Sequence, residues 1–344
     1  MHDIYDVLKI LKLDTGQQQF IAMQLGLICQ LHEAAGRNTP LNEYMKIALP
    51  AVSTKHLELV FDSLTRLLGV YFWASVSDEV SELMIEYGKP ALKQSKWSSG
   101  KNFWIIEFQV SSGARKPMLN QIVNTILRKH ESVTYFRIKP QGWYVKRVFS
   151  TTLKRRKLWK DSFRNQVLPS LTSNEKILHQ RKHSFLKAAI VGHCLMLFSE
   201  SPSLSKYPLK NAINVVRLFF GMRQIKLYFD ENGKAVGCLM WAWISESTAI
   251  RLKYESPQSI HPTEWNEGET LCLCELTWNG RITTAMEQDI SGALFQNEQR
   301  VLWYGRTEGD KDSTIHELNT GQLPDFYSSI LNVSKGKVSC FFDS

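Results

Sequence analysis

The stretches LLGVYFWASV at residues 67–76 and AVGCLMWAWI at residues 235–244 decide the fold, because they are two versions of the same strand sequence. Both are apolar runs, and Gly69, Trp73 and Ala74 of the first recur 168 positions later in the second. An internal repeat has to be recognised first, because it sets the whole architecture. Tryptophan is a rare residue, so its recurrence at a fixed offset indicates a duplicated domain.

The same offset holds on both sides of these strands. It relates Pro40 to Pro208, Trp97 to Trp265, Gly100 to Gly268, Glu107 to Glu275, Met118 to Met286 and Val133 to Val301. A single offset that runs unbroken from Pro40 to Val301 is stronger evidence than any one matched residue. We therefore predict two copies of one domain, at residues 1–150 and 184–344, joined by a basic helical tail and linker at 151–183.

Each copy shows the same order of hydrophobic patterns. In copy one these are helices at 20–34 and 41–52, strands at 55–62, 67–76 and 101–110, a helix at 117–130 and a strand at 132–138. In copy two they are helices at 188–200 and 209–220, strands at 224–230, 235–244 and 269–278, a helix at 285–298 and a strand at 300–306. The turn sequence DENG at 230–233 predicts a hairpin. The expected fold is α/β (α+β): two tandem N-acetyltransferase-like domains, each a mixed, mainly antiparallel sheet flanked by helices.

The composition is that of a globular protein, with 43% hydrophobic and 22% charged residues. We find neither a secretory signal nor an apolar run long enough to cross a bilayer, and expect a cytoplasmic protein. Six cysteines in so long a chain are expected to be buried thiols, and Cys272-x-Cys274 lacks the second pair that a zinc site needs. We expect no metal site.

The net charge of +9 favours an acidic partner. The basic run at 154–157 is interpreted as the exposed face of a tail helix, and nucleic-acid binding is not expected of it. The aromatic residues fall within apolar strands and not beside the basic clusters, which argues against base stacking.

The opening of copy two, VGHCLMLFSESPSLSKYPLKNAINVVRLFF, resembles that of the RTX toxin-activating lysine acyltransferases in its Gly192-His193, its Ser201-Pro202 and its Pro208. The resemblance extends to Trp-Ala at the end of a strand and to Trp-x-x-Gly before a strand that carries an acid, both present in each copy. It implies transfer of a fatty acyl group from acyl carrier protein to a lysine of a toxin or bacteriocin-type polypeptide.

The family's catalytic residues are a histidine four residues before the helix-leading proline and an aspartate on the later strand. Here the histidine position holds Gly36 in copy one and Leu204 in copy two, and the acid is Glu107 or Glu275. His32 lies one helical turn before Gly36 and is the candidate replacement in copy one, where the alternative is a partly exposed histidine at a helix end. Its counterpart in copy two is Glu200.

Glu107 and Glu275 interrupt apolar strands, so each is a candidate catalytic acid or a structural carboxylate. We expect Trp73, Trp97, Trp241 and Trp265 to bind substrate, and interpret His193 as a satisfied core histidine.

Two functions remain open. The chain is an active lysine acyltransferase, or it is a duplicated pseudoenzyme that binds or scaffolds the peptide or toxin during maturation. No coenzyme A loop is present, so acyl carrier protein is the expected donor and no tightly bound cofactor is expected. The two copies could pair within one chain, or the chain could form a homodimer.

Overall fold

We describe the protein from a computed structural model. It describes residues 8, 16–62, 64–87, 92–116, 118–119, 122, 129–139, 142–149, 175–201, 204–255, 260–279, 284–289, 300–305, 314–319 and 338–339. The chain divides into two compact units. Unit 1 comprises residues 1–15, 23–37 and 43–189, and unit 2 comprises residues 16–22, 38–42 and 190–344.

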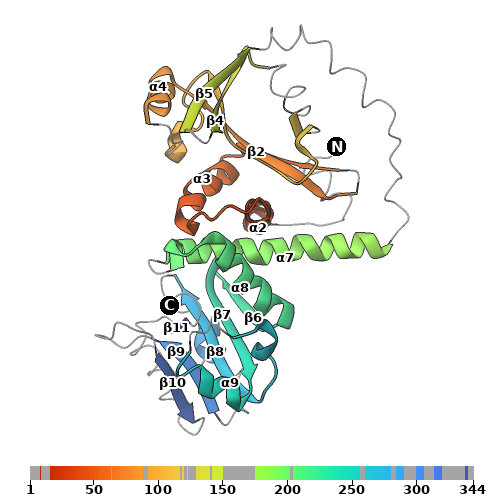
Figure 1. The fold of residues 1–344 in the computed structure, drawn as a ribbon, viewed down its shortest axis with the longest axis vertical. Coiled ribbons are helices and arrows are strands. Elements are labelled where there is room, and N and C mark those ends of the chain that lie inside the picture. The colour runs from red at the N-terminus through yellow and green to blue at the C-terminus, as the bar shows by residue number, and fades with distance from the viewer. Residues whose placement is uncertain are drawn as a thin grey trace. The chain divides into compact units, whose positions relative to one another are not determined.

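Copy one is a five-stranded mixed sheet with helices (Figure 1). Its elements are α2 (Gln17–Ala34), α3 (Leu41–Ser53), β1 (Leu57–Phe61), β2 (Leu67–Val76), α4 (Asp78–Tyr87), the short 3₁₀ helix η1 (Gln94–Lys96), β3 (Asn102–Val110), β4 (Ser132–Lys139) and β5 (Gly142–Phe149). The strands follow the order β1-β2-β3-β4-β5, and only the β3–β4 pair is parallel.

Copy two repeats this plan. Its elements are α7 (Glu175–Glu200), η4 (Leu204–Lys206), α8 (Leu209–Met222), β6 (Ile225–Phe229), β7 (Ala235–Ile244), α9 (Glu246–Arg251), η6 (Pro262–Trp265), β8 (Thr270–Trp278), α10 (Thr284–Gln288), β9 (Arg300–Gly305), β10 (Thr314–Asn319) and β11 (Val338–Ser339). The sheet order is β10-β9-β8-β7-β6, the β8–β9 pair is parallel, and β11 pairs with β8. The predicted mixed, mainly antiparallel sheets flanked by helices are confirmed.

The backbone repeats at the predicted offset in its irregular features as well as in its strands. Lys55 and Arg223, 168 residues apart, both adopt left-handed conformations with φ of 59° and 60° before the first strand. The first hairpin is irregular at Val60/Phe61 in one copy and at Tyr228/Phe229 in the other. A left-handed conformation is unfavourable for residues other than glycine. Its recurrence at Lys55 and Arg223, together with the matching hairpin irregularity, confirms the duplication.

Two of the repeated glycines are required by close packing. Gly100 lies against the backbone of Ser77, and a Cβ there would come within 2.6 Å of the Ser77 nitrogen. Gly268 lies in the same way against the backbone of Ile244 and Ser245. The Trp-x-x-Gly landmark is therefore a packing signature, in which glycine lets the loop touch the end of the preceding strand.

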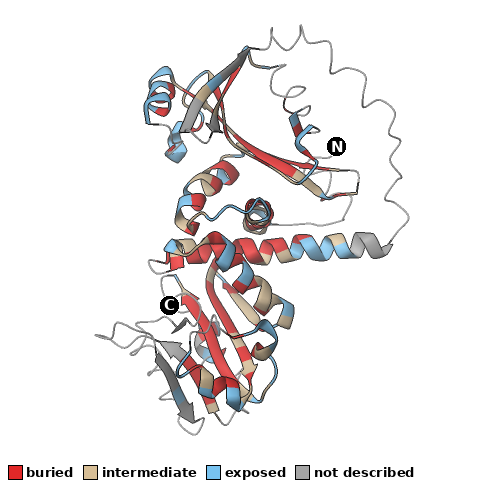
Figure 2. Ribbon diagram, in the orientation of Figure 1, coloured by how far each residue is buried: buried red, intermediate tan, exposed pale blue. Residues whose placement is uncertain are grey.

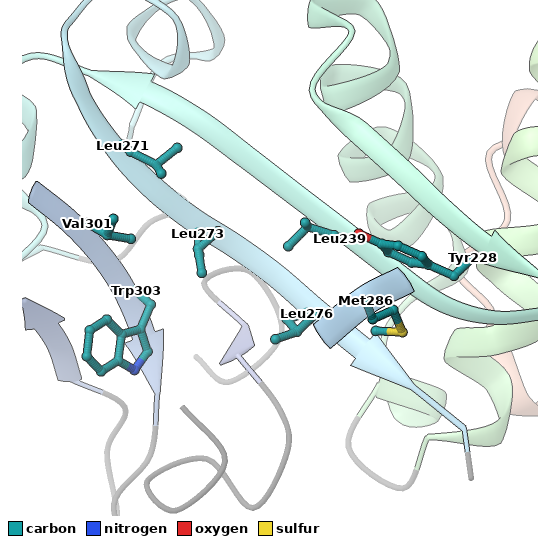
Figure 3. Packing of buried hydrophobic residues seen from close by; sticks show 8 residues of the cluster. All are labelled: Tyr228, Leu239, Leu271, Leu273, Leu276, Met286, Val301 and Trp303. Atoms are coloured by element: carbon teal, nitrogen blue, oxygen red, sulfur yellow. The ribbon is translucent and has the colours of Figure 1, made fainter. Parts of the chain in front are cut away.

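The sheet of copy two has an apolar core on each face. Figure 3 shows one of them, where Leu239, Leu271, Leu273 and Leu276 meet Met286 and Trp303. On the other face the Sγ atom of Cys238 lies 4.0 Å from that of Cys194 in α7. Burial of the middle strands is nearly complete (Figure 2). The free energy of burying these side chains, about 1.5–3 kcal/mol each, dominates the stability of such a sheet.

The helix contacts within each unit are unusually close. In unit 1, Gly26 of α2 lies directly against the backbone carbonyl of Ala188 in α7, and in unit 2, Gly192 of α7 lies against that of Ala22 in α2. Any side chain at Gly26 or Gly192 would collide with a helix backbone. Small residues spaced four apart allow helices to approach in this way.

Several predicted boundaries need correction. The first helix of copy two starts at Glu175 and not at residue 188, so it runs through our linker boundary. Residues 151–174, with the basic run, lie outside the described residues. The helix predicted at 285–298 is described only as α10, and most of the helix predicted at 117–130 lies outside the described residues. We did not predict α4, α9, β5, β10 or β11.

Substitution of the contact glycines tests this packing. Gly26→Ala and Gly192→Ala should each lower the free energy of unfolding by about 1–3 kcal/mol, because the added methyl group overpacks a helix contact. The matched control is Gly221→Ala in α8, where a Cβ meets nothing within 4 Å. That variant should keep or raise the melting temperature, since Ala favours a helix by about 1 kcal/mol over Gly. Equal melting temperatures for all three variants would contradict the packing.

Candidate active site

A β-bulge in the central strand aims the candidate acid. In unit 1, Phe72 pairs with Glu107 but the next residue of β2, Trp73, pairs with Ile105, so Ile106 is an extra residue in β3. Before the bulge Phe103 and Ile105 join one core, and after it Phe108 and Val110 do. A bulge shifts the alternation of side chains by one residue. It therefore places Glu107 and Gln109 on the opposite face, toward α2 and α3.

Glu107 meets Arg37 on this face. Arg37 Nη1 donates to Glu107 Oε1 at 2.8 Å, with 44% of the Arg37 side chain and 20% of the Glu107 side chain exposed. The backbone N–H of Phe108 also donates to Glu107 Oε1, at 3.2 Å. A solvent-accessible pair of this kind contributes at most about 1 kcal/mol to stability. The ion pair mainly positions the two groups, because it holds the Glu107 carboxylate and the Arg37 guanidinium together at the edge of β3.

His32 lies behind this pair and is buried, with 3% of its surface exposed. Gln109 Nε2 lies 2.7 Å from His32 Nδ1 and donates to the Tyr44 hydroxyl at 3.1 Å. The His32 and Tyr44 rings stack with centroids 4.1 Å apart. Burial, reinforced by the charge of Arg37, lowers the pKa of His32 to about 4. The imidazole is thus neutral near pH 7 and bonded into the interior, and is not the partly exposed histidine of the alternative.

Copy two keeps the backbone of this site and its glutamate, and lacks the arginine and tyrosine. Glu275 pairs with Met240 across the same bulge, but it is fully buried and accepts a hydrogen bond from the Thr277 hydroxyl. At the offset of 168, Arg37 corresponds to Ser205 and Tyr44 to Ala212. The two carboxylates therefore share a strand position and differ in their surroundings.

The edge of the central strand also differs between the copies. In unit 2, Val338 and Ser339 of β11 pair with Leu276 and Glu275 on β8. Because β7 pairs with these residues from the other side, β11 lies on the side of β9, beyond the short parallel β8–β9 pairing. In unit 1, among the residues that the structure describes, β4 pairs with β3 only at Trp104 and Ile105. No described strand covers the Glu107 edge there.

The comparisons with known proteins agree with this duplicated geometry. The model of the RTX toxin acyltransferase family matches residues 18–152 and again residues 183–319. The chain belongs to the RTX toxin acyltransferase family. A curated relative, the lysine-acyltransferase RtxC of Vibrio cholerae serotype O1, is 20% identical over 132 residues, which cover 38% of this chain and 86% of that protein. This length corresponds to about one copy.

The two family regions lack the histidine that the resemblance places before the helix-leading proline. Gly36 occupies that position in copy one with a left-handed φ of 71°, and Leu204 occupies it in copy two with 1% exposure. A left-handed backbone is unfavourable for most residues with a side chain, so the turn at Gly36 suits glycine.

The counterpart of His32 needs correction. Gly26 and Gly192, which make the same close helix contact, are 166 residues apart, so the connection that follows α7 is two residues longer than the one that follows α2. On this alignment His32 corresponds to Phe198, and not to Glu200 as expected from the offset of 168. Glu200 instead accepts a hydrogen bond from Lys234 at 3.0 Å. On either alignment copy two has no histidine at this position.

The four candidate tryptophans lie in equivalent places in the two copies. Trp97 and Trp265 are almost fully buried, with 1% exposure each, whereas Trp73 and Trp241 are half-buried. The backbone N–H of Trp73 donates to the carbonyl of His56, and that of Trp241 donates to the carbonyl of Gln224. Of these four, Trp73 and Trp241 are the ones that keep some exposure, and both also pack against the core.

The remaining polar and thiol candidates are interior residues. His193 is 4% exposed and packs edge-on against Phe229 at 5.0 Å, and its Nδ1 has no hydrogen-bond partner among the described residues, so the expected satisfied histidine is only partly correct. Five cysteines are buried free thiols, as predicted, and Cys340 lies outside the described residues. No described helix is both long and apolar enough to span a bilayer.

Sequence reasoning missed Arg37, Tyr44 and Gln109 as neighbours of the candidate acid. Arg37 and Tyr44 stand on either side of Pro40 without any motif around them. Gln109 could have been predicted as a neighbour, because a residue two positions after Glu107 lies on the same face of the strand. The bulge that turns this face toward α2 leaves no mark in the residue types.

Acid titration of stability tests the buried histidines. Burial lowers the pKa of both His32 and His193 to about 4, while unfolded histidine titrates near 6.5. Below pH 6.5 the unfolded chain binds protons that the folded chain does not, so the free energy of unfolding falls as pH drops from 6.5 to 4. Replacement His32→Gln should flatten this slope in chemical denaturation, and His193→Gln should do so independently. A His32→Gln slope equal to that of the unmodified protein would contradict the burial of His32.

Proposed function

We propose that this chain transfers a fatty acyl group from acyl carrier protein to a lysine side chain of a toxin or bacteriocin-type polypeptide, and that copy one carries out the reaction. The supporting observation is the Arg37–Glu107 pair, which stands at the edge of β3 with partial exposure. Membership of the toxin acyltransferase family supplies the reaction class. The polypeptide substrate and the carrier remain part of this proposal.

Glu107 is the proposed base of the reaction. The lysine nitrogen attacks the carbonyl carbon of the acyl thioester, so that a C–N bond forms and the C–S bond breaks. The carboxylate of Glu107 takes the proton that the amine loses, and this proton finally passes to the carrier thiolate. Arg37 has N–H groups beyond the one bonded to Glu107, and these can donate to the oxyanion that develops on the carbonyl.

His32 is proposed to position this machinery from the interior. It holds Gln109, which lies on the same strand face as Glu107 and also bonds Tyr44. The imidazole is buried and neutral, so it holds the Gln109 side chain in place and does not compete with Glu107 for the proton of the substrate amine. Trp73 pairs with Ile105 and packs on the apolar core, so it lies on the sheet face away from Glu107 and is not part of the site proposed here.

The proposed donor is acyl carrier protein because the protein is basic, with 42 Lys and Arg against 33 Asp and Glu, and because the sequence carries no glycine-rich phosphate loop. An acidic carrier would be attracted to such a surface. Its acyl chain is attached to the carrier through pantetheine, so this chain would need no phosphate-binding loop to hold the donor.

Copy two is proposed to be a non-catalytic partner of copy one. Glu275 is fully buried, its arginine counterpart is Ser205, and β11 pairs with the strand beside it. In the competing proposal both copies are non-catalytic, and the chain is a pseudo-acyltransferase that binds or scaffolds the polypeptide during maturation. This proposal is supported by the loss of the family's histidine from both copies.

An acyl-transfer assay separates these proposals. The full chain is incubated with acyl carrier protein that bears a long acyl chain and with the lysine-containing polypeptide encoded nearest its gene, and acylated lysine is measured by mass spectrometry. Glu107→Gln should lower the rate by about 100-fold or more, the usual effect of removing a general base. The matched variant Glu275→Gln should retain the rate within about threefold.

Thermal unfolding of both variants controls for loss of fold. Equal losses at the two positions would contradict the assignment of catalysis to copy one. Binding of the polypeptide without any transfer would support the pseudo-acyltransferase and overturn the enzyme.

A further inference from the structure

A serine and a histidine from distant parts of copy one meet beside β1. His56 immediately precedes β1, and Ser98 follows η1 and forms an isolated bridge with Ser75 of β2. The Oγ atom of Ser98 lies 3.0 Å from Nε2 of His56. Ser98 is exposed and His56 is half-buried, so the serine oxygen is accessible while the imidazole is supported from inside.

The hydrogen bonds of His56 define which ring nitrogen carries the proton. Its Nδ1 lies 2.9 Å from the carbonyl oxygen of Thr54, which can only accept, and 2.9 Å from the hydroxyl oxygen of Thr54. That hydroxyl donates its only hydrogen to the carbonyl of Pro50 at 2.7 Å, so it also accepts from His56. Nδ1 is therefore protonated and Nε2 presents its lone pair to Ser98. The Ser98 hydroxyl must donate to it.

The surroundings favour the basic form of the imidazole. The Trp73 and Trp97 rings flank His56 with centroid distances of 5.8 and 5.9 Å. Burial among these groups lowers the pKa of His56, so the ring is neutral near pH 7. A serine bonded to a neutral histidine, which is itself oriented by a third group, is the arrangement of an activated nucleophile.

Copy two has a hydrogen bond at the same place without this chemistry. Gln224 and Asn266 stand 168 residues after His56 and Ser98, and Gln224 Nε2 donates to Asn266 Oδ1 at 2.6 Å. An amide pair joins the two segments but has neither a nucleophile nor a base. Both copies therefore have a side-chain hydrogen bond at this position, and in copy one its members are a serine and a histidine.

We propose that Ser98 and His56 form a nucleophilic dyad that accepts acyl groups from activated esters or thioesters. For the natural donor this inference rests on the proposed acyl-transfer function and changes its order of steps: Ser98 breaks the thioester first, and the amine then attacks the Ser98 ester in place of the thioester. The Ser98 Oγ attacks the acyl carbonyl carbon and gives its proton to His56 Nε2, so that a C–O bond forms and the C–S bond to the carrier breaks. The leaving thiolate takes the proton from His56. Water or an amine then attacks the ester, and the released Ser98 oxygen regains a proton through His56.

A covalent probe tests this dyad without carrier protein or polypeptide. The full chain is treated with an alkyl fluorophosphonate, which modifies activated serines, and the modified peptide is identified by mass spectrometry. We expect a single phosphonyl group on Ser98. His56→Gln should slow the modification by about 100-fold or more, because the proton acceptor is gone. The double variant His56→Gln with Ser98→Asn installs the pair of copy two, and should keep the melting temperature while abolishing modification.

Each outcome decides one proposal. Absence of label on Ser98, or labelling of His56→Gln at the unmodified rate, overturns the dyad. Label on Ser98 without acylation of lysine in the transfer assay supports the dyad and overturns the proposed function. Lysine acylation that persists at full rate in a chain without Ser98 labelling supports the function and overturns the dyad.

Discussion

The extra residue in the central strand of each copy is the constraint on which the rest of the site depends. At Ile106 in β3 and at Cys274 in β8 the pairing with the neighbouring strand skips one position. A strand normally alternates its side chains between two faces, and one inserted residue reverses the assignment for everything that follows. Without it, Glu107 would join Phe103 and Ile105 in the apolar core. With it, the carboxylate reaches Arg37, and Gln109 reaches His32 and Tyr44.

The duplication separates what the backbone requires from what the chemistry requires. The bulges, the left-handed residues before the first strand, and Gly100 and Gly268, which pack on backbone, recur at an offset of 168. The carboxylate recurs as Glu107 and Glu275, but the side chains that surround Glu107 do not. Arg37 and Tyr44 correspond to Ser205 and Ala212, and the His56–Ser98 pair corresponds to Gln224 and Asn266. Copy two thus acts as an internal reference, in which the same scaffold keeps the glutamate but not the arginine, tyrosine and histidine of copy one.

Much of the fold could be predicted from the sequence because apolar periodicity and turn residues are local signals. The strands at 67–76 and 235–244 have the predicted bounds, and Gly233 in the DENG turn adopts the left-handed φ of 72° that a tight hairpin needs. The edge strands β5 and β10 were missed. Both carry charged residues among their apolar ones, as in KR at 146–147 and HE at 316–317, which weakens the alternation. The long start of α7 was missed because its first turns are polar.

The site was harder to predict because its contacts join distant residues. Arg37 and Glu107 are 70 residues apart, and His56 and Ser98 are 42 apart. Glu107 stood out as an acid in an apolar strand, but neither its face nor its partner is encoded locally. The loss of the family's histidine was visible at Gly36 and Leu204. The polar network that surrounds Glu107 became visible only when α2, α3 and β3 were placed together.

The central claim is that the two copies share a scaffold while only copy one is equipped to use the donor. Native mass spectrometry of the full chain with acyl carrier protein that bears a long acyl chain measures this directly, as the number of carriers held per chain. The account predicts a complex with one carrier. A complex with two carriers per chain would contradict it, because copy two would then be an equal site despite its buried glutamate and its β11 strand.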